Sequence, residues 1–285
     1  IFIFKEELET GKWYWLRVFP YKKNNWKRIL NMLSFCINLL IIFSWKYLKA
    51  IKDNKIPHVI IASSPQLPAA FTTFLLCRII RRPFVFEVRD LWPQTLIDQK
   101  KRNKDSFLIK TLSIMERLLY KYSNCVVVLS KGSINYVKRR GAKKVVWLPN
   151  GPDLKDFKFS KLPIENSSFD KKRPFNILYA GAHGELNDLS NVIEAGKLIR
   201  NHPIQFTFVG DGVEKNKLIE QAQNLDNFIF IDPLPKSQIP DLMAKYDAIL
   251  LSLKSSPVFK YGVSPNKLYD AYAIGRPVIS TVEGY

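Results

Sequence analysis

Short apolar runs recur along the whole chain and alternate with segments long enough for helices. Nine such runs are rich in β-branched and aromatic residues: 59–62, 84–88, 125–129, 145–148, 177–180, 206–209, 228–231, 248–252 and 277–280. Their hydrophobicity is continuous rather than alternating, which indicates strands that are buried on both faces of a sheet. Helix-length segments separate most of the runs, among them 107–122, 191–200, 215–224 and 266–274. The pattern therefore predicts an α/β protein with doubly wound parallel sheets.

The stretch 149–174 interrupts this alternation. It contains four prolines together with Asn-Gly and Asn-Ser-Ser turns, and neither a strand period nor a helix period continues through it. Such composition is typical of a linker. We therefore expect an N-terminal lobe at 1–148, a linker at 149–174 and a C-terminal lobe at 175–285. Ligands of open α/β sheets bind beyond the carboxyl ends of the strands, so the expected site is a cleft that both lobes face.

Charge divides the chain unequally. Residues 1–174 hold 34 of the 44 lysines and arginines and 13 of the 25 acidic residues, a net charge of +21, against −2 for residues 175–285. A basic half attracts anionic lipid headgroups, phosphorylated substrates or nucleic acid, unless it is simply a solvated lysine-rich surface. The basic clusters 100–102, 138–140 and 171–173 lie apart and lack interleaved aromatic residues, which argues against a nucleic-acid partner.

The segment 29–45 is apolar but is interrupted by Asn31, Ser34, Asn38 and Ser44. These residues would be costly at the centre of a bilayer, so an interfacial or core helix is favoured over a membrane span. The three cysteines lie far apart in apolar runs and suggest a reducing compartment. The sequence does not start with Met and stops directly after a strand-like run, so we expect a chain that is truncated at both ends.

Candidate chemistry begins with a glycine-rich loop after the first strand of the C-terminal lobe. Gly181, His183 and Gly184 lie in this loop, which precedes a helix. Glycines there allow backbone amides to approach an anion, although a glycine turn can also simply close a loop. The chain contains no G-x-G-x-x-G motif and no Asp-x-Asp pair, so a metal-chelated diphosphate is not expected.

A second candidate is the segment 262–279. Ser264 and Pro265 would start a helix whose first-turn amides, including that of Asn266, are free for an anion. Lys267 adds a positive charge, and Asp270 follows one turn later on the same side. This arrangement fits a diphosphate attached to a hydroxylated ring.

This segment, with its Gly-Arg-Pro ending, resembles the donor-site helix of the retaining group 1 glycosyltransferases, family 4, which have the GT-B fold. Residues 87–93, Glu-Val-Arg-Asp-Leu-Trp-Pro, are similar to a first-lobe motif in the O-antigen and capsule branch typified by L-fucosamine transferases. Residues 148–153 resemble the Pro-Asn-Gly-x-Asp entry to the linker in that family. The resemblance implies two Rossmann-like lobes, both incomplete here: the first lacks its first strand and the second is cut at its C-terminal end.

The resemblance also implies the reaction. It predicts transfer of an N-acetylated amino sugar, with retention and without metal, from a UDP-linked donor to a lipid-linked saccharide. The donor is a substrate, and no cofactor is expected. Asp270 would hold the donor ribose, and backbone amides with Lys267 would hold the diphosphate. The protein would act in the cytoplasm, bound peripherally to the anionic inner face of the cell membrane.

Arg89 and Asp90 are the catalytic candidates, because a charged pair at the carboxyl end of a buried strand can contact acceptor or donor phosphate. An Arg-Asp pair that only fixes its loop is the alternative. Two departures from the family pattern are visible: Gly262 stands where its first glutamate is expected, and the Arg and Lys of its glycine loop are missing. A non-catalytic, degenerate membrane scaffold is therefore the alternative to an enzyme, and a nucleic-acid-binding module is less favoured.

Overall fold

The computed structural model describes residues 3–8, 11–21, 26–100, 103–152 and 173–282, so most of the predicted linker lies outside the described residues. The chain divides into two compact units, Ile1–Leu148 and Pro149–Tyr285. Each unit contains a parallel β-sheet flanked by helices. All nine apolar runs form strands of these two sheets, which confirms the predicted α/β class.

The sheet of the first unit has four parallel strands in the order β3-β4-β5-β6. Their bounds are Ile60–Ser63, Phe84–Val88, Cys125–Val128 and Val145–Trp147. Successive strands lie side by side, so right-handed crossovers place the connecting helices on one face. These helices are α2 (Leu67–Ile79), α3 (Gln94–Lys100), α4 (Phe107–Tyr122) and α5 (Ser133–Arg139). Phe84 and Phe86 pack under them, with ring centroids 5.7 Å from Phe74 and 5.8 Å from Tyr120.

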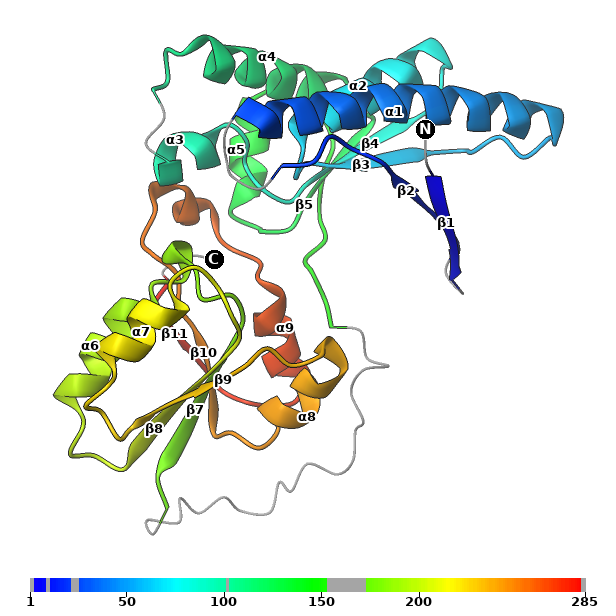
Figure 1. The fold of residues 1–285 in the computed structure, drawn as a ribbon. Helices are drawn as coiled ribbons and strands as arrows, with labels where there is room; N and C mark the ends of the chain where they lie inside the picture. Colours follow the sequence, from blue (N-terminus) through cyan, green and yellow to red (C-terminus); the bar gives the residue numbers. More distant parts are fainter. Residues whose placement is uncertain (1–2, 9–10, 22–25, 101–102, 153–172, 283–285) are drawn as a thin grey trace. The chain divides into compact units, whose positions relative to one another are not determined.

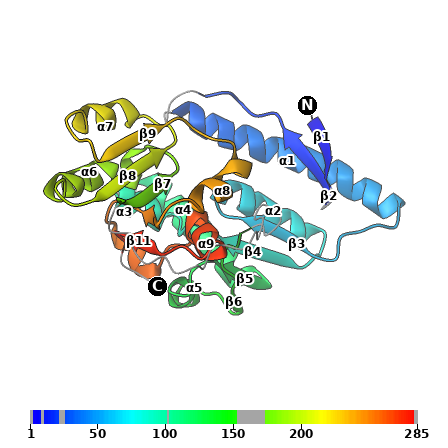
Figure 2. The ribbon, with the colours of Figure 1, turned by 90° about the horizontal axis from the view of Figure 1, so that it is seen from below.

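A long helix and a hairpin precede this sheet. Helix α1 spans Trp26–Lys52 and packs against α2. Strands β1 (Ile3–Leu8) and β2 (Gly11–Leu16) form an antiparallel hairpin next to α1, which the sequence analysis did not predict (Figures 1 and 2). Among the described helices, α1 alone is long and apolar enough to cross a membrane, and only 6% of its most apolar window is buried. The helix predicted at 29–45 is thus confirmed and is longer than expected.

The sheet of the second unit has the order β11-β10-β7-β8-β9. The strands span Val278–Ser280, Ala248–Leu251, Phe175–Ala180, Ile204–Val209 and Phe228–Ile231. The chain starts at the central strand β7, adds β8 and β9 on one side, and then returns to add β10 and β11 on the other. The strand order therefore reverses between β7 and β10, which defines a topological switch point.

Helices cover both faces of this second sheet (Figure 1). Helices α6 (Leu189–Leu198) and α7 (Lys215–Gln221) contribute to one buried cluster, which includes Tyr179 and Phe208. Helices α8 (Ile239–Met243) and α9 (Asn266–Ala273) contribute to the other, which includes Leu178 and Ile249. Neighbouring residues of β7 thus point to opposite faces, and each face has its own core. This is the doubly wound arrangement that the continuous apolar runs predict.

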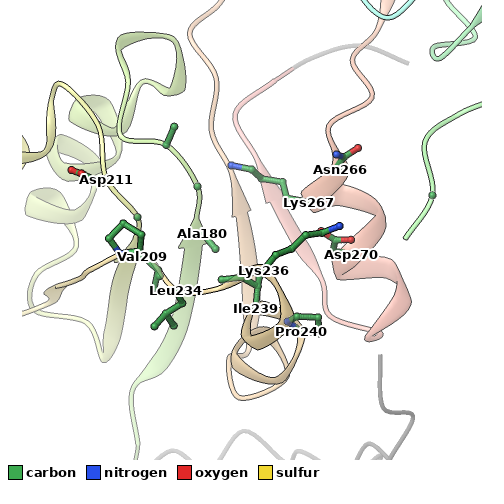
Figure 3. Close-up of a pocket in the computed structure, with 15 residues that line it drawn as sticks. Ala180, Val209, Asp211, Leu234, Lys236, Ile239, Pro240, Asn266, Lys267 and Asp270 are labelled. Carbon is green, nitrogen blue, oxygen red and sulfur yellow. The ribbon is translucent and has the colours of Figure 1, made fainter. Parts of the chain in front are cut away.

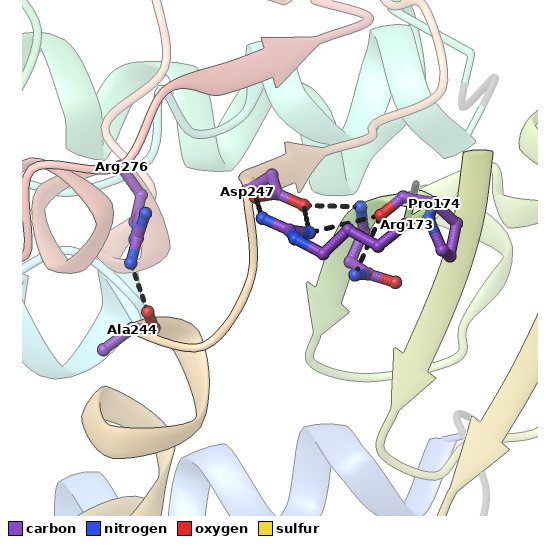
Figure 4. A network of polar contacts seen from close by, with 6 residues as sticks. Arg173, Pro174, Ala244, Asp247 and Arg276 are labelled. Atoms are coloured by element: carbon purple, nitrogen blue, oxygen red, sulfur yellow. Dashed lines mark hydrogen bonds and ion pairs between the residues drawn. The ribbon is translucent and has the colours of Figure 1, made fainter. Parts of the chain in front are cut away.

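An ion pair links two neighbouring strands at the amino-terminal end of the second sheet. Asp247, just before β10, accepts two hydrogen bonds from Arg173, at 2.7 and 2.6 Å, and one from the backbone N–H of Asn176 at 2.8 Å (Figure 4). The bidentate geometry suits a guanidinium and a carboxylate. Asp247 therefore joins the first residues of β7 to the strand beside it.

Candidate functional site: a pocket at the strand-order switch

A pocket of about 640 Å³ opens at the carboxyl ends of the strands in the second unit (Figure 3). The loops after β7, β8 and β9 and the first turns of α9 line it. It thus lies where the strand order reverses, which is where open α/β sheets bind ligands. Its size falls in the range of small-molecule sites, about 300–1,000 Å³.

Two glycines allow the loops after β7 and β8 to touch. Gly181 has a φ of +156° and Gly210 a φ of +143°, which are conformations that L side chains rarely adopt. A Cβ on Gly210 would lie 2.0 Å from the carbonyl oxygen of Gly181, so no side chain fits there. Backbone hydrogen bonds from Gly181 to Val209 (2.9 Å) and from His183 to Asp211 (2.8 Å) hold the loops together. The result is a backbone-lined wall of the pocket.

Lys267 faces this wall from α9. Its Nζ lies 3.9 Å from the centroid of the Tyr179 ring, and burial lowers the pKa of Lys267 to about 8. Asp270 follows one turn later and also lines the pocket, as Asn266 does. In Figure 3 the side chains of Asp270 and Lys236 point toward one another across the pocket. Four of the eight predicted donor-site residues, Gly181 with these three of α9, therefore lie together.

Ser264 and Pro265 support the pocket without lining it. Pro265 is the N-cap of α9 and has an extended backbone, with φ −74° and ψ 137°. The hydroxyl of Ser264 lies 2.8 Å from that of Tyr269, and its carbonyl accepts a hydrogen bond from Asn150 at 2.7 Å. Asn150 belongs to the Pro-Asn-Gly motif, and the next residue, Gly151, lines the pocket. The motif thus fixes the start of α9.

His183 and Gly184 do not line the pocket. His183 is fully buried, with its ring centroid 6.1 Å from that of Tyr179, 6.3 Å from that of Phe208 and 6.4 Å from that of Phe230. Neither of its ring nitrogens has a hydrogen-bond partner among the described residues. Burial lowers the pKa of His183, so the ring is neutral at physiological pH. The structure therefore places it behind the glycine loop as a packing residue.

Arg89 and Asp90 belong to the first unit, at the carboxyl end of β4. Both side chains are exposed. Their backbone N–H groups donate to the hydroxyl oxygen of Ser64, at 2.9 and 3.1 Å, which fixes the turn after the strand. They are not part of the pocket of the second unit.

Sequence reasoning missed the apolar end of the pocket. Pro233 and Leu234 follow β9, and Ile239 and Pro240 begin α8; all four line the pocket, as do Gly210 and Asp211. Gly210 and Pro233 could have been predicted as pocket residues from their positions after a strand. The strand order, which the sequence does not show, decides which strand ends meet. Among the described residues no group of three His, Cys, Asp or Glu side chains is placed to hold a metal ion.

Comparison with known proteins agrees with this fold. Residues 174–285 match the family model "Glycosyl transferases group 1". The chain is similar to WcaI of Escherichia coli (strain K12), named as a colanic acid biosynthesis glycosyl transferase: 26% identity over 295 residues, covering 99% of this chain and 70% of WcaI.

Solved structures show the same fold at lower identity. Sucrose-phosphate synthase from Thermosynechococcus elongatus superposes with a TM-score of 0.69 at 15% identity, over 98% of this chain and 67% of that one. Anabaena HepE in complex with UDP superposes with a TM-score of 0.60 at 17% identity, over 88% of this chain and 64% of that one. The chain thus spans roughly two thirds of the length of these proteins.

The chain is therefore an α/β protein with the two-lobe fold of the GT-B glycosyltransferases. The match to the group 1 model is confined to residues 174–285, and the similar protein WcaI is named as a glycosyl transferase.

Proposed function

We propose that the protein transfers a sugar from a nucleoside diphosphate donor to a saccharide acceptor during synthesis of a cell-surface polysaccharide. The observation that carries this proposal is the pocket at the strand-order switch of the second unit. It combines a glycine-built backbone wall, a lysine without a counter-ion among the described residues, and an apolar end. A nucleotide presents the matching sequence of groups: an apolar base, a hydroxylated ribose and an anionic diphosphate.

The donor can be oriented by these groups. Pro233, Leu234 and Pro240 offer an apolar surface for the base. The ammonium group of Lys267 offers a positive charge for the diphosphate, and the absence of a side chain at Gly181 lets the ligand come close to the backbone of the loop. Asp270 lies one turn along α9 from Lys267, on the side toward Pro240 in Figure 3, where a carboxylate can accept hydrogen bonds from ribose hydroxyls.

Calorimetric titration with UDP tests this orientation. Asp270→Ala and Lys267→Ala each remove one charged hydrogen bond, which is worth roughly 1.5–3 kcal/mol, or about 10- to 150-fold in Kd. Asp241→Ala is the matched control, because Asp241 is an exposed carboxylate of α8 that does not line the pocket. Unchanged affinity for UDP in both pocket variants would contradict the proposal.

The donor and the stereochemistry are the finer part of the proposal. HepE, which shares the fold, has been solved with UDP and with UDP-glucose, and this supports a uridine nucleotide. We propose an N-acetylated amino sugar as the group transferred, with retention of configuration, no metal requirement and a lipid-linked acceptor. Arg89 and Asp90 would contact acceptor or donor phosphate. An inverted anomer in the NMR spectrum of the product would refute retention of configuration. Inactivation by a chelator would refute the metal independence.

Membrane docking through α1 is the second part of the proposal. Nine of its large apolar side chains are at least 41% exposed: Trp26, Ile29, Leu33, Ile37, Leu40, Ile41, Trp45, Leu48 and Ile51. Spacings of three and four residues place most of them on one stripe of the helix. The helix contains five basic residues and no acidic one, so its charge complements an anionic bilayer.

The polar residues of α1 are occupied on another side of the helix. Asn31 donates to the carbonyl of Phe19 at 2.7 Å, and Asn38 donates to that of Arg17 at 2.5 Å. Lys46 donates to the hydroxyl of Tyr14 at 2.9 Å. These bonds bind the preceding segment and leave the apolar stripe open. We therefore propose that α1 lies in the plane of the anionic cytoplasmic face of the membrane.

Sedimentation of the full chain with vesicles tests this docking. We expect binding to phosphatidylglycerol vesicles at low salt, weaker binding at high salt and little binding to phosphatidylcholine. Leu33→Glu should abolish it, whereas Ile219→Glu, an equal change at an exposed residue of α7 in the second unit, should not. Equal sedimentation with neutral and anionic vesicles would refute the electrostatic part, and resistance to alkaline extraction would instead indicate a spanning helix.

A further inference from the structure

One tyrosine connects both sides of the anion end of the pocket. Tyr179, the fifth residue of β7, is fully buried. Its hydroxyl donates a hydrogen bond to the carbonyl of Ala182 in the glycine loop at 2.8 Å, and its ring lies 3.9 Å from Nζ of Lys267 on α9. A Cβ on Gly181 would lie 3.1 Å from that Nζ and 3.3 Å from the Tyr179 hydroxyl. The ammonium group therefore sits against the loop, over the ring.

The ring is the partner that the structure gives to Lys267. No hydrogen bond or salt bridge to this lysine occurs among the described residues. A cation over an aromatic face is attracted by the negative face of the ring, an interaction that strengthens when water is excluded. Burial without a counter-ion disfavours the charged form, which is why the pKa of Lys267 falls to about 8. The ammonium group is thus held in place while its charge remains uncompensated.

We propose that Tyr179 is a positioning residue of the diphosphate subsite, which holds Lys267 with its ring and the glycine loop with its hydroxyl. This inference rests on the proposed donor binding. It explains how one lysine replaces the basic residues that are missing from the glycine loop. It further implies that donor binding is coupled to protonation of Lys267, because only the ammonium form attracts a diphosphate.

The charged and titratable groups around Lys267 allow this coupling to be isolated. His183 lies behind the glycine loop, while Asp211, Lys236 and Asp270 line the same pocket. Burial lowers the pKa of His183 and raises that of Tyr179, so both stay neutral from pH 7 to 9. The last ionisation of a phosphate monoester lies near pH 6, so the diphosphate of UDP keeps a constant charge above pH 7.5. Between pH 7.5 and 9, the titration of Lys267 should dominate.

The sign of the pH effect follows from linkage. A bound diphosphate favours the ammonium form and raises the pKa of Lys267 above about 8. Above that pH, binding must take up a proton, so affinity falls as pH rises, by at most about tenfold per pH unit. Calorimetry in two buffers of different ionisation enthalpy measures this proton uptake directly. Lys267→Met should bind UDP weakly and without this pH dependence.

Two substitutions of Tyr179 separate its roles. Tyr179→Phe keeps the ring, so we expect weaker UDP binding with the same pH midpoint. Tyr179→Leu removes the ring but keeps an apolar side chain, so the ammonium loses its partner and the midpoint should move to lower pH. A residue that only fills the core would not move this midpoint. The experiment is calorimetry of the full chain with UDP from pH 7 to 9.5.

A direct measurement covers the case in which Tyr179→Leu does not fold. In the wild-type chain labelled at the lysine ε-carbon, the ring should shift the ε-protons of Lys267 upfield, and the signal is assigned by its loss in Lys267→Met. We expect it to titrate near pH 8 and to move on addition of UDP. An ordinary lysine shift and titration above pH 10, or wild-type midpoints in both tyrosine variants, would overturn the positioning role. Absence of UDP binding by the wild-type chain would instead overturn the proposed function itself.

Discussion

Replacement of Arg140 should destabilise the first unit more at alkaline than at acidic pH. Glu116 on α4 has no exposed side-chain surface, and Arg140, which follows α5, donates to its carboxylate at 2.6 Å. The hydroxyl of Tyr136 donates to the other oxygen at 3.2 Å. Arg140→Ala removes the charge that compensates this buried carboxylate.

The magnitude depends on the protonation of Glu116. Burial raises the pKa of this carboxyl from 4.5 to about 7, although Arg140 opposes the shift. The folded unit therefore keeps a proton between these values that the unfolded chain has lost, so stability falls as pH rises through this window, by about 3 kcal/mol in total. Without Arg140 the pKa rises further and the loss continues to higher pH. We expect Arg140→Ala to cost about 1 kcal/mol at pH 5, from the lost hydrogen bond.

At pH 8 the variant must either bury an unpaired carboxylate or keep it protonated. Keeping the proton one pH unit above the wild-type pKa of about 7 costs about 1.4 kcal/mol, so we expect a total cost of about 2–2.5 kcal/mol, which rises further at higher pH. Urea unfolding followed by tryptophan fluorescence measures the first unit selectively, because all six tryptophans lie before residue 149. Arg139→Ala is the control, since the neighbouring Arg139 is exposed. Equal losses of stability at pH 5 and pH 8 would refute this account of the pair.

Two further changes concern the second unit. Gly210→Ala should displace the loop after β8 and lower the unfolding temperature of this unit, because the new Cβ would lie 2.0 Å from the carbonyl oxygen of Gly181. Gly184→Ala is the control and should leave the unfolding temperature unchanged, because a Cβ there meets only the Asn187 amide at 3.8 Å. Differential scanning calorimetry compares the two variants. Asp247→Ala should cost about 1–3 kcal/mol through loss of the Arg173 pair, measured by circular dichroism, with exposed Asp241→Ala as the control.

The strands and helix α9 were predictable because their signals are local. A run such as 248–251, Ala-Ile-Leu-Leu, is apolar on both faces, and this suffices to predict a buried strand. Pro265 before a helical pattern predicts where α9 begins, and the spacing of three residues places Lys267 and Asp270 on one side. The structure confirms both elements. The β1–β2 hairpin was missed because it lies outside both sheets and because Lys5, Glu6 and Glu7 interrupt the apolar pattern of β1.

The remaining residues of the pocket depend on strand order. Gly210 and Gly181 are far apart in the chain, and their contact follows only once β8 lies beside β7. Pro240 begins a helix of only five residues, which is too short to give a hydrophobic period. For His183 the sequence suggests a contact that the structure does not show. Its glycine-rich loop suggests ligand contact, but three aromatic rings hold the side chain behind that loop.

Helix α1 shows that the cost of a polar residue in an apolar segment cannot be judged until its hydrogen-bond partner is known. From sequence, Asn31 and Asn38 count against a membrane helix, because unpaired amides are costly in hydrocarbon. In the structure their side chains satisfy backbone carbonyls of the preceding segment, at Phe19 and Arg17. Their cost is thereby largely removed, and the apolar stripe of α1 stays continuous. The same residues that argue against a span in the sequence thus bind the preceding segment to α1 in the structure.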